Sequence, residues 1–147
     1  GGGISCCGTS AITVTRCTLR GNATTDGGAS ILCGCYAHAE IELSVLAFGT
    51  GGPAVVCGAV STAALRCCVV YGHSGGDWTG CIESQLGADG NLWSDPIFCE
   101  DSLSVALQSP CHPDSNTCGE QIGAGGVGCS TGLREAATWG RIKAGYR

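Results

Sequence analysis

Cysteine gives this chain its largest capacity for chemistry, with 13 cysteines among 147 residues. A thiol can pair into a disulfide, bind a soft metal ion or act as a nucleophile. Four cysteines share one position of a repeat, each five residues after a glycine: Cys6, Cys33, Cys57 and Cys81. They lie 27, 24 and 24 residues apart, and a period of this size indicates a chain built by stacking one small unit.

These repeated cysteines are predicted to be packed thiols rather than disulfides. Residues stacked in register on parallel strands keep their Cβ atoms near the strand spacing, which exceeds the roughly 3.8 Å mean separation in a disulfide. We therefore expect the four to fill the interior as small hydrophobic side chains. The candidates for disulfides lie outside this column: Cys111, Cys118 and Cys129, and Cys7 with Cys35. The odd total leaves at least one thiol free or bonded between molecules.

No metal site or other cofactor is expected. Adjacent residues of a strand point to opposite faces, so the doublets Cys6-Cys7 and Cys67-Cys68 cannot chelate an ion from one side. No cysteine pair with a two-residue spacer is matched by a second pair, and the histidines stand singly.

Two other groups of residues have weaker claims to a site. Glu40 and Glu42 share one side of an alternating segment and could form a carboxylate pair, but we interpret them as a solvated face. Asp77 followed by Trp78 could mark a sugar-binding edge, because an exposed aromatic ring can stack on a sugar. A turn residue followed by a packing tryptophan is the favoured interpretation.

The elements that position these side chains are predicted to be short strands. Apolar residues alternate in 12–19 and 41–45, which is typical of strands with one buried face, and glycine pairs supply the corners. Successive units carry matched residues: Val14 with Ile41 and Leu65, Leu19 with Leu46 and Val70, and Cys17 with Ser44 and Cys68. The sequence therefore predicts an all-β, parallel β-solenoid of about five or six turns over residues 1–130.

A family resemblance supports this fold. The runs NLWSDPIFC, LSVALQSPC and CGEQIGAGGVGC resemble the terminal turns of secreted bacterial right-handed parallel β-helix repeat proteins of the pectate-lyase-like superfamily. The glycine-led units GGGISC and ITVTRCTLRGNAT resemble the repeats of the same family. The resemblance implies that the parallel β-helix is right-handed. Because proteins with this fold include lyases, hydrolases, adhesins and structural proteins, the resemblance implies no single function.

The charged constellation of the enzymes in that superfamily is missing. Pectate lyases use clustered carboxylates and a basic residue, whereas only three basic residues precede residue 133. Gly72-His73-Ser74 and Arg141-Ile142-Lys143 match the order of a polygalacturonase pattern, but the elements with its acid and base carboxylates are absent. We therefore predict that the protein is not an enzyme.

Composition restricts the compartment and the partners. The cysteine content indicates an oxidising, extracellular or cell-surface location. No stretch reaches the roughly 18 apolar residues of a membrane span, and a net charge of −5 gives no indication of a nucleic-acid partner. Without an initiator methionine or a signal peptide, the chain is expected to be processed or to be a fragment.

Residues 131–147 form a basic C-terminal tail, which is predicted to be extended. From residue 133 onward it holds four of the seven basic residues and one acidic residue, so it carries +3, whereas the preceding body carries −8. Apolar and cationic residues alternate near its end, as in an edge strand. The residues expected to anchor it in an assembly are Trp139, Arg141, Ile142, Lys143, Tyr146 and Arg147. A flexible tail, or one docked within its own chain, is the alternative.

These features together predict a structural, self-assembling protein. The first repeat begins at Gly1 without a capping element, and an open end of a solenoid exposes strand edges. Head-to-tail contacts between copies generate a filament when they do not close into a ring. A basic tail that binds along an acidic neighbour would stabilise such a filament. The alternative is the C-terminal part of a larger cell-surface protein that binds or processes polysaccharide.

Overall fold

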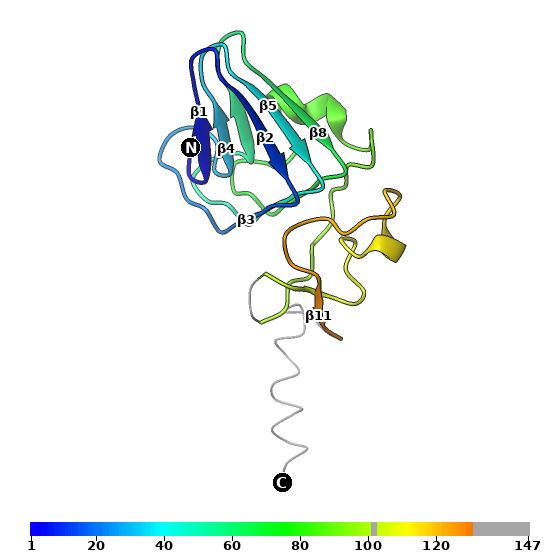
Figure 1. The fold of residues 1–147 in the computed structure, drawn as a ribbon. Coiled ribbons are helices and arrows are strands. Elements are labelled where there is room, and N and C mark those ends of the chain that lie inside the picture. The colour runs from blue at the N-terminus through cyan, green and yellow to red at the C-terminus, as the bar shows by residue number, and fades with distance from the viewer. Residues whose placement is uncertain (101–102, 131–147) are drawn as a thin grey trace.

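The computed structural model describes residues 1–100 and 103–130, which form a parallel β-solenoid of about five turns (Figure 1). Each of its first three turns contributes three strands: β1 (Ile4–Cys6), β2 (Ala11–Thr15) and β3 (Thr18–Arg20), then β4 (Ile31–Cys33), β5 (His38–Glu42) and β6 (Val45–Ala47), then β7 (Val55–Cys57), β8 (Thr62–Arg66) and β9 (Val69–Tyr71). Equivalent strands stack into three parallel sheets, ordered β1-β4-β7, β2-β5-β8 and β3-β6-β9. The predicted fold class is therefore confirmed.

The register of the ladders confirms the predicted columns. Val14 pairs with Ile41, which pairs with Leu65, and the column that begins at Leu19 follows the same steps of 27 and 24 residues. These side chains point inward, where they join the main cluster of buried apolar residues. The repeat period thus places one apolar side chain above the next, which fills the narrow interior.

One residue in the left-handed conformation turns the chain at each corner between the second and third strands. Arg16, Leu43 and Cys67 occupy this position with φ values of 52°, 49° and 52°. Left-handed geometry costs a residue with a side chain roughly 1–2 kcal/mol. The corner must therefore be held by other interactions.

A column of polar side chains next to this turn supplies them. We call Cys17, Ser44, Cys68 and Asn91 the corner ladder. The Ser44 hydroxyl oxygen accepts from the Cys17 amide at 3.0 Å, and Asn91 Oδ1 accepts from the Cys68 amide at 3.0 Å. Asn91 Nδ2 also donates to the Leu65 carbonyl at 2.8 Å. Ser44 thus ties the second turn to the first, and Asn91 ties the fourth turn to the third, by satisfying backbone groups at the corner.

The 3-10 helix η1 (Gly80–Gln85) closes one end of the first two sheets. Gln85 Oε1 accepts from the Leu65 amide at 2.7 Å, and its Nε2 donates to the Ala63 carbonyl at 2.8 Å. The side chains of Trp78 and Ile82 pack against the core beneath. The edge of β8 is therefore covered within the chain.

The segment after residue 94 packs against the solenoid over a second apolar cluster. It contains the parallel pair β10 (Val105–Ala106) and β11 (Val127–Cys129) and the 3-10 helix η2 (Pro113–Ser115). Residues 118–124 run back along the corner column, because Cys118 is bonded to Cys67, Gly123 N donates to the Leu43 carbonyl at 2.7 Å and Glu120 pairs with Arg16.

Candidate functional site

Three side chains form a buried hydrogen-bonded chain in the order serine, histidine, aspartate. Ser30 precedes β4, whereas His73 and Asp77 follow β9 on either side of the Gly75-Gly76 pair. Ser30 Oγ lies 2.9 Å from His73 Nε2, and His73 Nδ1 lies 2.8 Å from Asp77 Oδ1. The solenoid register brings them together, although Ser30 and His73 are 43 residues apart in the sequence.

The direction of the hydrogen bonds follows from the electrostatics of the site. Burial tends to raise the pKa of Asp77, but backbone and side-chain donors outweigh it and lower that pKa. Burial lowers the pKa of His73, against an opposing effect of Asp77. A neutral His73 therefore donates from Nδ1 to an ionised Asp77, and the Ser30 hydroxyl donates to the unprotonated Nε2.

This order of groups is that of a nucleophile, a base and an orienting carboxylate. Catalysis also requires that a substrate reach the hydroxyl, with donors placed for the developing negative charge. Ser30 is only 1 % exposed, and Gly49 approaches the His73 ring so closely that a Cβ there would lie 2.6 Å from it. In this arrangement the network fixes the chain between turns rather than presenting a nucleophile.

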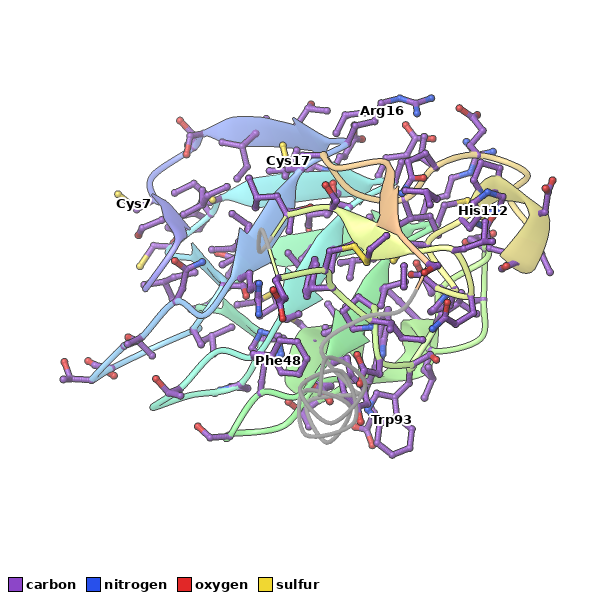
Figure 2. The ribbon with its side chains drawn as sticks, turned by 90° about the horizontal axis from the view of Figure 1, so that it is seen from below. Cys7, Arg16, Cys17, Phe48, Trp93 and His112 are labelled. Atoms are coloured by element: carbon purple, nitrogen blue, oxygen red, sulfur yellow. A yellow bond between two sulfur atoms is a disulfide. The ribbon has the colours of Figure 1, made fainter. Side chains whose placement is uncertain are left out.

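The network ends at the surface in an exposed tryptophan. Asp77 Oδ2 accepts from Trp93 Nε1 at 2.8 Å, although Trp93 is 63 % exposed. The Trp93 ring projects at the edge of the molecule in Figure 2. The Trp93 ring lies 6.4 Å from that of Tyr71, which meets Phe48 edge-on at 5.9 Å. We call Trp93, Tyr71 and Phe48 the aromatic platform.

Sequence reasoning found parts of this site but not the site itself. The favoured interpretation of Trp78 as a packing residue is confirmed, because it is buried in the main core cluster. The sequence pattern links Asp77 to Trp78, however, and not to His73 or to the exposed Trp93. The available signal was the four-residue spacing between His73 and Asp77 at a glycine-pair corner. No sequence pattern points to Ser30, because its position opposite His73 depends on the exact number of residues in each turn.

The prediction that the repeated cysteines remain thiols is wrong for two of the four. Cys57 and Cys81 form a disulfide with a Cα–Cα distance of 6.1 Å. Cys81 lies on η1 rather than on a strand, so its side chain is not held at the strand spacing and can reach Cys57. Cys6 and Cys33 lie in register on β1 and β4 as buried free thiols. Burial, with contributions from neighbouring Cys6, raises the pKa of Cys33 to about 12.

The predicted disulfide cysteines are also divided. Cys118 and Cys129 are bonded, to Cys67 and Cys99 respectively. The proposed Cys7–Cys35 bridge is wrong, since both are exposed free thiols. The register that pairs Cys6 with Cys33 places Cys7 beside Gly34, so Cys35 lies one residue beyond Cys7 around the corner.

Cys111 is likewise a free thiol and not a disulfide partner. It is fully buried in the second apolar cluster, where burial raises its pKa to about 12. The cysteine nearest to it in sequence, Cys118, is already bonded to Cys67. Cys111 therefore acts as a small apolar side chain.

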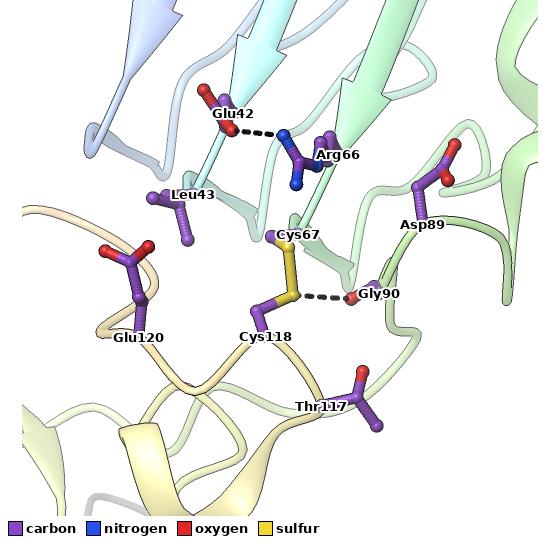
Figure 3. Close-up of a pocket in the computed structure, with 9 residues that line it drawn as sticks. All are labelled: Glu42, Leu43, Arg66, Cys67, Asp89, Gly90, Thr117, Cys118 and Glu120. Carbon is purple, nitrogen blue, oxygen red and sulfur yellow. Dashed lines mark hydrogen bonds and ion pairs between the residues drawn. A yellow bond between two sulfur atoms is a disulfide. The ribbon is translucent and has the colours of Figure 1, made fainter.

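Two adjoining pockets of about 310 and 350 Å³ lie on the outer side of β5 and β8 and share Glu42, Arg66 and Asp89. Figure 3 shows the Cys67–Cys118 disulfide between the Glu42–Arg66 ion pair and the Gly90 carbonyl. The Glu42–Arg66 distance is 3.2 Å, but both side chains are well exposed, so the pair contributes little stability. We interpret these carboxylates as part of a solvated face.

Other expectations can be placed against the described part of the chain. Within residues 1–100 and 103–130, no three His, Cys, Asp or Glu side chains are grouped so as to hold a metal ion. No helix in these ranges is long and apolar enough to span a membrane. The tail residues from Trp139 to Arg147 lie outside the described residues.

The fold and the bonded cysteines define the class of this protein: a parallel β-solenoid with three disulfides, which indicate an oxidising compartment. No protein-family model matches the chain, and no match is found among curated proteins or solved structures.

Proposed function

We propose that this protein is an extracellular structural subunit that self-assembles head to tail into filaments, with the C-terminal tail docking on a neighbouring subunit. The observation that carries the proposal is that, within the described residues, the first turn has a neighbouring turn on one side only. Strands β1, β2 and β3 are each the outermost strand of their sheet. Ile4, Ile12 and Leu19 on these strands are only partly buried. Such an edge can pair with another chain.

The distribution of charge supports a contact between unlike ends. Residues 1–66 contain three arginines and three acidic residues, whereas residues 67–130 contain eight acidic residues and no lysine or arginine. A head-to-tail assembly requires two different, complementary surfaces. The first turn, whose residues 1–27 carry two arginines and one aspartate, differs in this way from the acidic end of the solenoid, and residues 133–147 carry +3. The burial of Ser30 supports a role without catalysis.

The alternative is the C-terminal part of a larger cell-surface protein that binds or processes polysaccharide. It is favoured by the resemblance to secreted bacterial β-helix proteins and by the exposed ring of Trp93, on which a sugar ring could pack. Retention of the chain on polysaccharide supports, without any assembled form, would favour this alternative.

Light scattering and negative-stain imaging of the intact 147-residue chain test the proposal. We expect filaments, and we expect Thr13→Pro to abolish them. The Arg16 amide donates to Glu42 on β5, so in an alternating strand the Thr13 amide faces the open side. Proline there removes only an outward donor, and circular dichroism would check that the fold is kept. A chain that remains monomeric at high concentration would contradict the proposal.

A further inference from the structure

The Trp93 indole is held rigidly although most of it is exposed to solvent. The indole N–H donates a hydrogen bond to Asp77, and the ring packs against that of Tyr71 at a centroid distance of 6.4 Å. Asp77 is itself fixed by the buried His73. A side chain that is already ordered loses little conformational entropy when a ligand binds, so the platform is preorganised.

The charge behind the indole makes its face attractive to cations. The Asp77 carboxylate accepts from four donors: the amides of Gly72 and His73, the His73 ring and the Trp93 ring. With a neutral His73, none of these donors compensates the negative charge. A carboxylate that accepts the indole N–H increases the electron density of the ring, and cations bind the faces of electron-rich rings.

Two members of the platform, Trp93 and Tyr71, belong to the acidic half of the sequence. Trp93 belongs to residues 67–130, which contain eight acidic residues and no lysine or arginine. Arg20 stacks on the Phe98 ring at 4.6 Å from its centroid, and Phe98 in turn lies 6.2 Å from Phe48 of the platform. The site therefore favours a cation supplied from elsewhere.

The tail supplies such cations and has the reach to deliver them. Arg141 follows Ser130 by 11 residues and Arg147 by 17. Chain geometry allows at most about 40 Å and 61 Å for these lengths, whereas five turns stack over about 24 Å. The basic segment can thus lie along a neighbouring subunit from its first turn to Trp93.

We infer that Trp93 and Tyr71 are the receiving site for the arginine and lysine side chains of residues 141–147 of another copy of this chain. The inference rests on the proposed function of the tail and names the surface on which the tail docks.

A peptide titration tests the inference directly. The probe is a labelled peptide of residues 133–147 with Trp139→Phe. The acceptor is the full chain with Arg141→Gln, Lys143→Gln and Arg147→Gln, and binding is followed by fluorescence anisotropy at low salt. We expect Trp93→Ala to weaken binding about fivefold to tenfold, and Trp93→Phe to weaken it less because a ring face remains. Half-molar salt should weaken binding to every acceptor.

Tyr36 provides the matched control. It is 64 % exposed, almost the same as Trp93, but it lies in the neutral half of the chain. Its φ is 62°, so Tyr36→Asn removes the ring without strain, and binding should not change. Equal binding by Trp93→Ala and its parent, or an equal loss in Tyr36→Asn, would overturn the inference. The inference would also be overturned if binding of a neutral polysaccharide required Trp93 and binding of the peptide did not.

Assembly of the intact chain separates this inference from the proposed function. If Trp93→Ala forms filaments as well as its parent but the tail-charge variant does not, the tail docks elsewhere and only the inference fails. If the parent chain never assembles, the proposed function fails, and the peptide titration still decides the inference.

Discussion

Replacing Asn91 with alanine should destabilise the solenoid by about 2–6 kcal/mol. Asn91 is buried, and its side chain satisfies the Cys68 amide at 3.0 Å and the Leu65 carbonyl at 2.8 Å. Alanine leaves both groups without a partner inside the protein, and each unsatisfied buried group costs about 1–3 kcal/mol. That is a large part of the 5–15 kcal/mol total typical of a domain.

The repeat itself provides a rescue variant for this experiment. Ser44 holds the same position two corners earlier, where its hydroxyl accepts from the Cys17 amide and donates to the Glu42 carbonyl at 2.8 Å. Asn91→Ser should therefore recover about half of the loss. Asn116→Ala is the control, because Asn116 makes similar bonds, to the Cys118 amide and the His112 carbonyl, but is only partly buried. We expect it to cost about 1 kcal/mol.

Urea unfolding with the disulfides intact would measure these differences. The midpoints should shift at constant slope, which reports stability alone. A loss below about 1 kcal/mol in Asn91→Ala, with no advantage for Asn91→Ser, would show that the corner ladder does not hold the turns together.

Three further predictions concern pH, thiols and corners. Burial lowers the pKa of His73, so the unfolded chain binds a proton at this residue more readily than the folded chain does. The free energy of unfolding should therefore fall as pH drops below about 6.5 and level off once folded His73 is protonated. Urea unfolding across pH would measure this dependence, which should disappear in His73→Gln. Alkylation of the native protein followed by mass spectrometry should modify the exposed Cys7 and Cys35 first, and denaturation without reductant should reveal seven thiols; fewer would mean a further disulfide. Gly51→Ala should destabilise the protein by at least about 3 kcal/mol and Gly21→Ala by about 1 kcal/mol. Both glycines have positive φ, but only at Gly51 would a Cβ meet a backbone carbonyl of the preceding turn. Equal midpoints in thermal melts of the two variants would refute this.

The sequence was sufficient for the fold because repetition specifies register directly. Once Val14, Ile41 and Leu65 share a column, every other residue on those strands is placed by counting. Alternation then assigns the inner and outer faces. Both arguments use only local spacing, and local spacing is what a stacked unit preserves.

The same reasoning failed where the repeat ends. Cys81 keeps the column position, but the strand expected there is replaced by η1, and the disulfide to Cys57 becomes possible. Asn91 continues the corner ladder 23 residues after Cys68, whereas the earlier steps of that column are 27 and 24. A shortened step breaks the count, so the sequence pattern could not assign Asn91 to its column.

The Ser30–His73–Asp77 network has the hydrogen-bond order of a catalytic triad, but its hydroxyl is buried. A hydrolase needs its hydroxyl open to a substrate, whereas here the hydroxyl is the buried end of the network and an indole is the exposed end. The negative charge of Asp77 is held by neutral donors in a largely buried position, and moving it would leave several polar groups unpaired. The core therefore dictates where Trp93 points. We therefore propose recognition of another chain, rather than catalysis, as the role of this rigid exposed ring.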